Sequence, residues 1–302
     1  MRGLDGGVLR TDLATAGELE PFILVLEGSV PNEQINGAGH WAGFGVDHET
    51  GQPITTNEWL DRLAPQADAV LAVGTCAAYG GVPAMRNNPT GAMGLRDYLG
   101  WDWRSRQGVP IVNLPGCPVQ PDMITETLLQ MVLHVARLGP PLPLDAQGRP
   151  ERLFKLTAHE NCDRAGMAEQ GQFADSHGSG NRCLVKLGCK GPVVKCSVPA
   201  RGWMGGIGGC PNVGGICMAC TMPGFPDKYM PFMDASPTAR LYAATARLGH
   251  GPLVRYLRQR RIQRKFDVEP KWRRPGAELL TGYAPPPAAG AEDDRRLEAT
   301  VR

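Results

Sequence analysis

The sequence predicts an α/β fold, a doubly wound parallel sheet, followed by a second domain with little regular structure. Two observations support this. In the first half, short apolar runs that end in turn residues alternate with segments of helical spacing, the pattern of strands joined by crossover helices. In the second half, seven of the nine cysteines fall between Cys162 and Cys220, in a segment rich in glycine and proline.

Three apolar runs predict buried parallel strands, since such strands are apolar on both faces. Two segments between and after them have the apolar spacing of helices, and the second carries a proline and an aspartate near its start, as helix N-termini do. The expected strands are Pro21–Leu26, Ala69–Val73 and Pro110–Leu114, and the expected helices are Asn57–Leu63 and Pro121–Leu138.

Two cysteines follow predicted strands. Cys76 lies in a glycine-flanked loop after the second strand, and Cys117 lies in Pro115-Gly116-Cys117-Pro118 after the third. Because parallel strands place their carboxyl ends along one edge of the sheet, the two thiols are expected to meet there. Glycines let backbone approach a bulky inorganic group and leave amides to hydrogen-bond its sulfides. The alternative is a pair of structural cysteines in glycine turns.

The chain divides into three predicted parts: an α/β domain over residues 1–145, a cysteine-rich domain over 146–235 and a tail over 236–302. The first boundary follows the linker-like composition of residues 138–150. The tail includes a basic helix candidate, Leu253–Phe266, and the end from Pro285 is expected to be disordered. A basic helix is most often a solvated face, with contact to acidic lipid or an acidic partner as the alternative.

Composition excludes some classes of protein. The 302 residues are 42% hydrophobic and 21% charged, typical of a globular chain of about two domains. No run of about 18 apolar residues occurs, so no membrane span is predicted. The net charge of +2 is uninformative, and we expect no nucleic acid partner.

The cysteine-rich segment is predicted to bind iron-sulfur clusters, each of which requires several converging thiolates. Disulfides are disfavoured by the odd cysteine count, by a length sufficient for a core and by the lack of an apolar leader at Met1. Structural zinc is the better alternative because Cys217 and Cys220 form a CxxC pair, but the sequence has no second one. His159, three residues before Cys162, is a further candidate ligand, with a polar turn histidine as its alternative.

Read together, these motifs resemble the small, electron-transferring subunit of nickel-iron hydrogenases. The resemblance covers most of the chain from Pro21 to Phe232. It is carried by the following segments: Phe22 to Pro31, Gly74-Thr75-Cys76, Pro115-Gly116-Cys117-Pro118, His159-Glu160-Asn161-Cys162, Cys183 to Pro192 and Cys217-Met218-Ala219-Cys220.

The resemblance implies a flavodoxin-like first domain, three iron-sulfur clusters in a line and a partner large subunit that holds the nickel-iron site. It implies an oxidoreductase subunit that carries electrons from hydrogen oxidation to an acceptor that the sequence does not specify. The implied ligands are Cys76 and Cys117 for the proximal cluster, Cys196, Cys217 and Cys220 for the medial cluster, and His159, Cys162, Cys183 and Cys189 for the distal cluster. Glu27 is expected near the proximal cluster, tuning its potential or relaying protons, or else facing solvent in a turn.

Cys210 departs from the common family pattern, which has a proline where a fourth medial ligand would lie. A fourth thiolate favours a 4Fe-4S medial cluster, with 3Fe-4S as the alternative. The glycine-rich surroundings of Cys210 resemble the actinobacterial-type, oxygen-insensitive branch, which also ends without a membrane anchor.

The second departure lies at the amino terminus, where the family takes two more proximal ligands from an earlier strand and loop. Residues 1–20 contain no cysteine, so the family's amino-terminal portion is expected to be missing, through a misassigned start or a shortened paralogue. Asp5 is a conceivable substitute ligand. The rival functions are a quinone-reductase or other electron-transfer subunit and a truncated inactive paralogue. We expect a cytoplasmic protein, with peripheral membrane contact left open.

Overall fold

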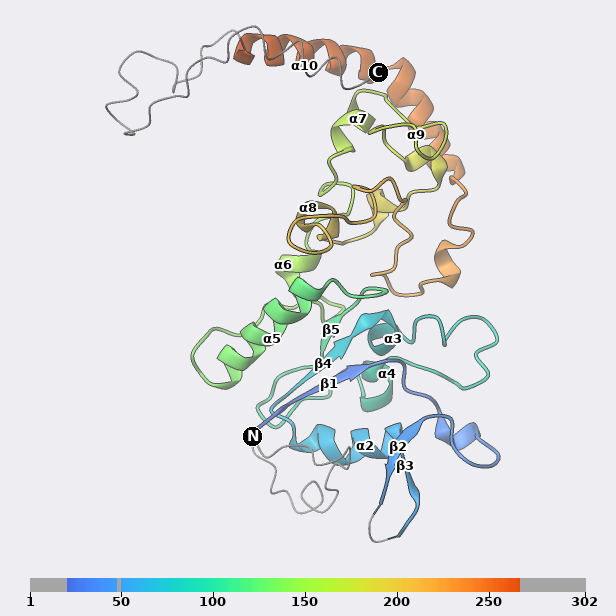
Figure 1. Cartoon of the computed structure of the whole chain (residues 1–302), viewed down its shortest axis with the longest axis vertical. Helices are drawn as coiled ribbons and strands as arrows, with labels where there is room; N and C mark the ends of the chain where they lie inside the picture. The colour runs from blue at the N-terminus through green and yellow to red at the C-terminus, as the bar shows by residue number, and fades with distance from the viewer. Residues whose placement is uncertain (1–20, 48–49, 267–302) are drawn as a thin grey trace, which may run out of the picture. The chain divides into compact units, whose positions relative to one another are not determined.

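The computed structural model describes residues 21–47 and 50–266 (Figure 1). The described residues up to Pro252 belong to one compact unit, and those from Leu253 on belong to a second. The strands are β1 (Ile23–Glu27), β2 (Gly43–Val46), β3 (Pro53–Thr55), β4 (Ala69–Val73) and β5 (Val112–Leu114). In the described residues no helix is both long and apolar enough to cross a membrane. The candidate ligand Asp5 and the end from Pro285 lie outside the described residues.

The helices fall into two groups along the chain. Those among and directly after the strands are η1 (Glu33–Ile35), α2 (Thr56–Leu63), η2 (Ala64–Gln66), α3 (Gly74–Tyr79), α4 (Leu95–Leu99) and α5 (Pro121–Val135). Those that follow are α6 (Glu151–Phe154), α7 (Ala165–Glu169), η3 (Val185–Leu187), η4 (Gly191–Val193), α8 (Val198–Arg201), η5 (Asp227–Tyr229), α9 (Pro237–Leu248) and α10 (His250–Phe266).

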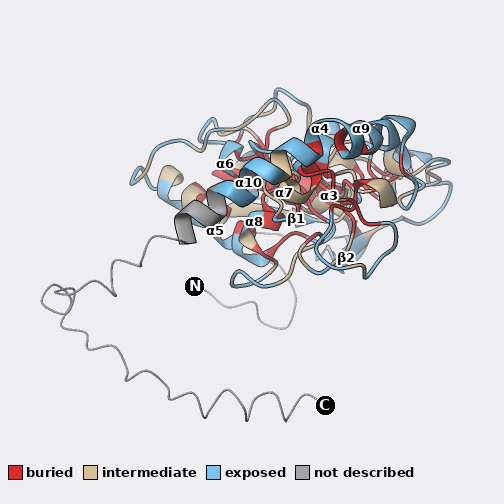
Figure 2. Ribbon diagram, turned by 90° about the horizontal axis from the view of Figure 1, so that it is seen from above, coloured by how far each residue is buried: buried red, intermediate tan, exposed pale blue. Residues whose placement is uncertain are grey.

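The main sheet is parallel and has the order β1-β4-β5. Every residue of the central strand β4 is buried, and its alternate side chains face two separate cores. Ala69, Leu71 and Val73 pack with α5 and with residues of the cysteine-rich region, whereas Val70 and Ala72 pack with α2 and α4. The predicted α/β class is confirmed, because both faces of a parallel sheet are covered. Figure 2 shows buried residues around β1 and α3 and mostly exposed surface on α9.

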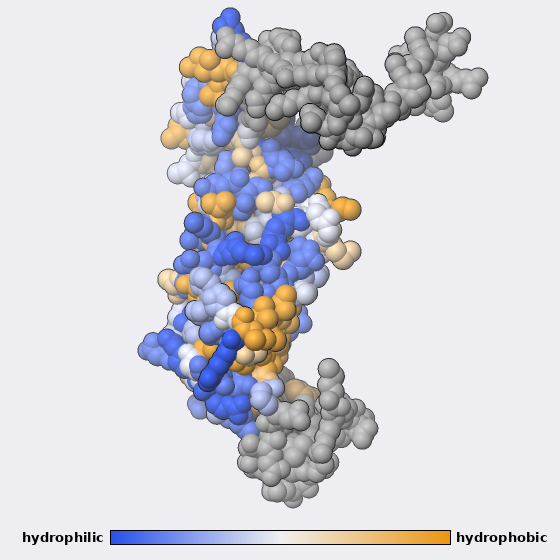
Figure 3. Space-filling view, turned by 90° about the vertical axis from the view of Figure 1, so that its left-hand side faces the viewer, coloured by the Kyte–Doolittle hydropathy of each residue, from blue (hydrophilic) through white to orange (hydrophobic). Residues whose placement is uncertain are grey.

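α5 ends three residues earlier than predicted. Its start agrees, with Pro121 in the first turn and Asp122 following it. At its end, Arg137 adopts a φ of 60°, and the Leu138 N–H donates to the Leu133 carbonyl at 2.8 Å. This closing turn usually places a glycine at the left-handed position, so an arginine there gives no sequence signal. Figure 3 shows hydrophobic side chains gathered on the face that carries α5, where Leu129, Val132 and Leu133 are exposed.

The segment with linker-like composition is packed. Leu144 pairs with Pro150, and Asp145 and Arg149 form an ion pair at 2.8 Å. The Arg149 side chain is 3% exposed. A core of buried residues runs from β4 and β5 through α5 and α6 to Cys196 and Cys217. Residues 138–150 therefore join two halves of one packed unit. The boundary between residues 145 and 146 stays a prediction.

Candidate metal centres

Cys76 and Cys117 lie at the same edge of the main sheet. Val73 and Leu114, which pair in register, end β4 and β5, and the two cysteine segments follow them. The Thr75 N–H donates to the Gly116 carbonyl at 2.9 Å, and the Gly116 N–H donates to Thr75 Oγ1 at 3.0 Å. Burial, reinforced by the nearby Cys76 thiol, raises the pKa of Cys117. The structure therefore brings these two predicted residues together.

The surroundings of Cys76 differ from the expected loop, because residues 74–79 form the short helix α3. The chain then turns back at Gly81, which has a φ of +57°. A Cβ at Gly81 would lie 2.7 Å from Cys76 Sγ and 2.9 Å from its backbone nitrogen. Only glycine permits both this φ and this approach of backbone to the thiol.

Glu27 ends β1 opposite Val73, at the carboxyl edge of the sheet that carries both cysteine segments. Its side chain is exposed in this chain. The position places it at the expected edge, and its role in tuning or proton transfer stays a prediction.

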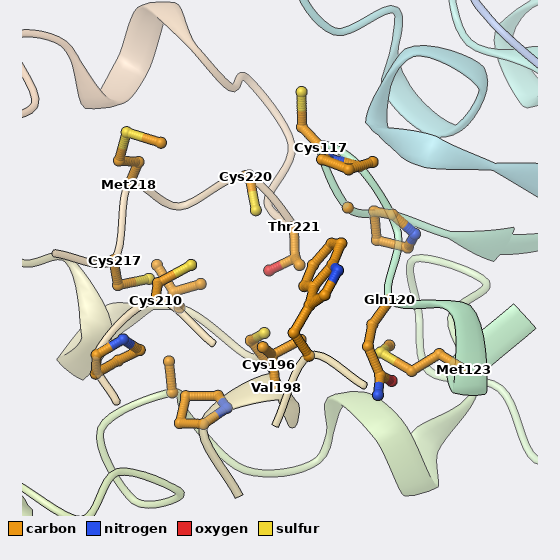
Figure 4. A pocket seen from close by; sticks show the side chains of 18 residues that line it. Cys117, Gln120, Met123, Cys196, Val198, Cys210, Cys217, Met218, Cys220 and Thr221 are labelled. Atoms are coloured by element: carbon orange, nitrogen blue, oxygen red, sulfur yellow. The ribbon is translucent and has the colours of Figure 1, made fainter. Parts of the chain in front are cut away.

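Four cysteines surround a cavity of about 80 Å³ (Figure 4). The sulfur atoms of Cys196, Cys210, Cys217 and Cys220 point toward the interior of this space, whereas the Cys117 sulfur at its rim points away. The remaining lining is largely apolar and includes Met123, Val198 and Trp203. Cys210, the residue that departs from the common pattern, therefore joins the predicted medial set.

This central group fits a polynuclear iron-sulfur centre better than water. A single water needs about 10–15 Å³ of such volume and several polar partners, and the cavity offers mainly sulfur and carbon. Burial raises the pKa of Cys196 to about 12 and that of Cys220 to about 11, and it also raises the pKa of Cys217. Neutral thiols are thus favoured without metal, and iron would supply the compensating positive charge. Within the described residues no three His, Cys, Asp or Glu side chains are arranged to hold a single metal ion.

A second, smaller cavity is lined by the four predicted distal residues, His159, Cys162, Cys183 and Cys189. The Arg164 N–H donates to Cys162 Sγ at 3.4 Å. Burial raises the pKa of Cys183 to about 11 and lowers the pKa of His159. A neutral imidazole is the form that binds metal. The donor set of one imidazole and three thiols fits an iron-sulfur cluster.

The three groups are joined by direct contacts. The Cys217 N–H donates to Cys189 Sγ at 3.3 Å, which connects the central group to the outer one. The hydroxyl of Thr75, one residue before Cys76, donates to the Cys220 carbonyl, which connects the sheet edge to the central group. The order in space is therefore sheet edge, central group, outer group.

Sequence reasoning missed several residues that hold this arrangement. Arg164 is buried, and its guanidinium donates to the carbonyls of Pro211, Gly180 and Arg182 at 2.7–2.9 Å. It thereby ties together the segments that carry Cys162, Cys183 and Cys210. Thr75 and Arg149 connect the sheet to the central group in a similar way. Thr75 and Arg164 could have been found from the sequence, because they lie one and two residues from the predicted ligands Cys76 and Cys162. The sequence around Arg149 gave no such signal.

Two family models match separate parts of the chain. Residues 154–233 match the C-terminal region of the NiFe/NiFeSe hydrogenase small subunit. Residues 6–131 match the NADH ubiquinone oxidoreductase 20 kDa subunit.

Relatives and solved structures agree with the first of these matches. The chain is 36% identical over 228 residues to the periplasmic NiFeSe hydrogenase small subunit of Desulfomicrobium baculatum, covering 71% of this chain and 67% of that protein. A hydrogenase small subunit of Methanosarcina mazei is 35% identical over 240 residues, covering 76% of this chain. The chain spans 59% of the length of that relative.

Among solved structures, an actinobacterial-type NiFe-hydrogenase from Ralstonia eutropha matches with a TM-score of 0.80 and 59% identity. The match covers 90% of this chain and 78% of that one. The NiFeSe hydrogenase of Desulfomicrobium baculatum matches with a TM-score of 0.64 at 34% identity, over 75% of this chain and 80% of that one.

Proposed function

Since the chain belongs to the family of nickel-iron hydrogenase small subunits, we propose that it relays electrons from hydrogen oxidation in a partner large subunit to an acceptor. The observation that carries this proposal is the row of three sulfur-rich groups joined by the Thr75–Cys220 and Cys217–Cys189 contacts. Iron-sulfur clusters bound there would supply one-electron redox chemistry.

In this proposal each group of residues holds one cluster. Cys76 and Cys117 serve the proximal position, and the central group serves the medial position. His159, Cys162, Cys183 and Cys189 serve the distal position. The proximal set lies at one edge of the sheet, and the medial and distal sets each line one cavity. The three sets also follow one another in the order that an electron relay needs.

We propose a 4Fe-4S cluster at the medial position. Its support is the direction of four sulfurs, Cys210 included, into one cavity. The 3Fe-4S alternative would leave Cys210 without a role in a space that it helps to line.

The division of labour follows the predicted domains. Residues 1–145 would present the proximal edge to the large subunit, and residues 146–235 would carry electrons outward. The support for a partner on the first surface is chemical, because Cys117 is an exposed residue in the isolated chain. A cluster there needs shielding from water, and a second protein would provide it.

A cytoplasmic location is also proposed. All nine cysteines lie within the described residues and are free thiols, as expected in a reducing compartment. Contact with a membrane surface through the basic residues of α10 belongs to the same proposal.

The rival function is a quinone-reductase electron-transfer subunit, which the family match over residues 6–131 favours. The cysteine-rich half, matched over residues 154–233, supports the hydrogenase function instead.

Co-expression with a candidate large subunit tests the proposal. The expected result is a complex that contains nickel and iron and reduces a dye with hydrogen as the electron donor. A Cys217→Ser variant should lose dye reduction while the large subunit still exchanges hydrogen isotopes. A chain that purifies as a fully loaded monomer and reduces quinone without a hydrogen-activating partner would contradict it.

A further inference from the structure

Arg149 is a buried cation in the segment that joins the two halves of the chain. Its side chain is 3% exposed, and its guanidinium faces the Phe154 ring at 5.1 Å. A charge at such depth is costly unless it is compensated. The contacts of Arg149 therefore indicate what the charge does there.

The guanidinium reaches the backbone of the central group. Its Nη1 donates to the Thr221 carbonyl at 3.3 Å and lies 3.6 Å from Met222 Sδ, directly after Cys220. Thr221 in turn donates its hydroxyl to the Lys195 carbonyl at 2.8 Å, one residue before Cys196. Arg149 thus lies against the two segments that carry Cys220 and Cys196.

The compensating carboxylate is placed farther toward water. Asp145 accepts from Arg149 Nε at 2.9 Å and from the backbone amides of Gln147 and Arg149 at 2.9 and 3.0 Å. Its side chain is 16% exposed, against 3% for Arg149. Solvent screens the carboxylate more than the guanidinium, so the pair presents its positive end to the interior.

Arg149 also lies close to the lining of the central cavity. Thr221, whose carbonyl accepts from Arg149, lines that cavity together with Cys196, Cys210, Cys217 and Cys220. Arg149 therefore places its charge directly behind the wall of the cavity.

We propose that Arg149 raises the reduction potential of the cluster held by Cys196, Cys210, Cys217 and Cys220, and that Asp145 limits this effect. The inference rests on the proposed ligand set. One-electron reduction adds negative charge to the cluster, and a nearby buried cation stabilises that reduced form.

Redox titration monitored by electron paramagnetic resonance, on the purified complex of both subunits, tests this charge effect. Arg149→Met should make reduction of the medial cluster about tenfold less favourable, a negative shift of about 59 mV for a one-electron couple. Asp145→Asn keeps an oxygen for the backbone amides and removes the opposing charge, so it should shift the potential in the positive direction. Arg149→Lys should stay near the parent value.

Arg152→Met is the matched control. Arg152 lies three residues away, is 63% exposed and pairs with Glu126, so its removal should leave the potential unchanged. Iron content is measured for every variant. An unchanged potential in fully loaded Arg149→Met, or shifts of the same sign in Arg149→Met and Asp145→Asn, would overturn the proposal. If Arg149→Met does not assemble, the sign of the Asp145→Asn shift decides. Absence of a medial signal in the parent complex would instead refute the ligand set.

Discussion

At the scale of single residues, burial sets the chemistry of the thiols. It raises the pKa of Cys183, Cys196 and Cys220 to between about 11 and 12, so these groups hold their protons at neutral pH without metal. Cluster assembly must therefore release protons as each thiolate binds iron. These three cysteines also lose favourable packing if iron is absent.

His159 provides the first prediction at this scale. Replacing it with alanine removes the imidazole from the outer cavity while leaving Cys162, Cys183 and Cys189 in place. Changes around metal ligands typically lower activity by roughly 10- to 100-fold. Reduction of an external dye by hydrogen should fall by at least that factor. Hydrogen isotope exchange, which requires only the large subunit, should be retained. Equal loss of both activities would show that the residue is needed for assembly.

Cys210 provides the second. Cys210→Pro removes one of the four sulfurs that face the central cavity. Since three thiolates remain, the oxidised complex should gain the paramagnetic signal of a three-iron cluster in stoichiometric amount. Electron paramagnetic resonance of the oxidised parent and variant measures this. A strong three-iron signal already present in the intact parent would show that Cys210 is not a ligand.

At the scale of elements, short helices and glycine turns place the ligands. Gly188 directly follows η3 and adopts a left-handed conformation with a φ of 98°, and Cys189 comes next. A Cβ at Gly188 would overlap the Phe232 carbonyl oxygen. α9 packs over the same region, where Ala243 and Ala246 contact the core that includes Cys183 and Val185. The outer group is therefore held by close backbone packing around very short elements.

Gly188→Ala tests this dependence. The added methyl must displace residues 232–234 or move Cys189, so the distal cluster should be lost from a large fraction of the purified complex. Gly178→Ala is the matched control, because Gly178 also has a positive φ, 79°, but a methyl group there would meet no atom within 4 Å. The control should incur only the backbone cost of a left-handed alanine, about 1–2 kcal/mol. Iron analysis and the distal paramagnetic signal provide the readout, and equal loss in both variants would point to backbone strain alone.

At the scale of the whole molecule, the sheet and the cysteine-rich region share one core but differ in how they are stabilised. β4 is buried throughout and is hydrogen-bonded on both sides. Residues 155–236 contain only short helical segments in the structure, the longest of five residues. Such a region depends on bound metal for part of its folding free energy.

Removal of iron by a chelator under reducing conditions should therefore unfold the two halves unequally. Backbone amides in residues 157–231 should lose protection against hydrogen exchange, while those of β4 should keep most of theirs. Hydrogen exchange with mass spectrometry, before and after removal, measures the difference. Simultaneous loss of protection in β4 would show that the clusters stabilise the entire unit.

Much of this organisation follows from the sequence. The apolar run of Ala69–Val73 predicted a buried parallel strand whose limits agree with the structure, because a fully buried strand has no polar interruption. The positions of Cys76 and Cys117 after their strands predicted a meeting at one edge, since parallel strands share that edge. Cysteine spacing was enough to predict iron-sulfur chemistry, and the order and spacing of six segments together predicted the family.

Only the tertiary structure decided how the groups connect and what surrounds them. The direction of Cys210 into the central cavity, the Cys217–Cys189 contact and the position of Arg149 join residues up to 73 positions apart. Residues 138–150 have the composition of an exposed linker, yet Asp145 neutralises Arg149 and lets the segment pack. Local sequence sets the hydrophobic period of a helix or strand and the kind of side chain that can bind a cluster, because both depend on neighbouring residues. Burial of a charge depends on partners distant in sequence, and folding brings them together.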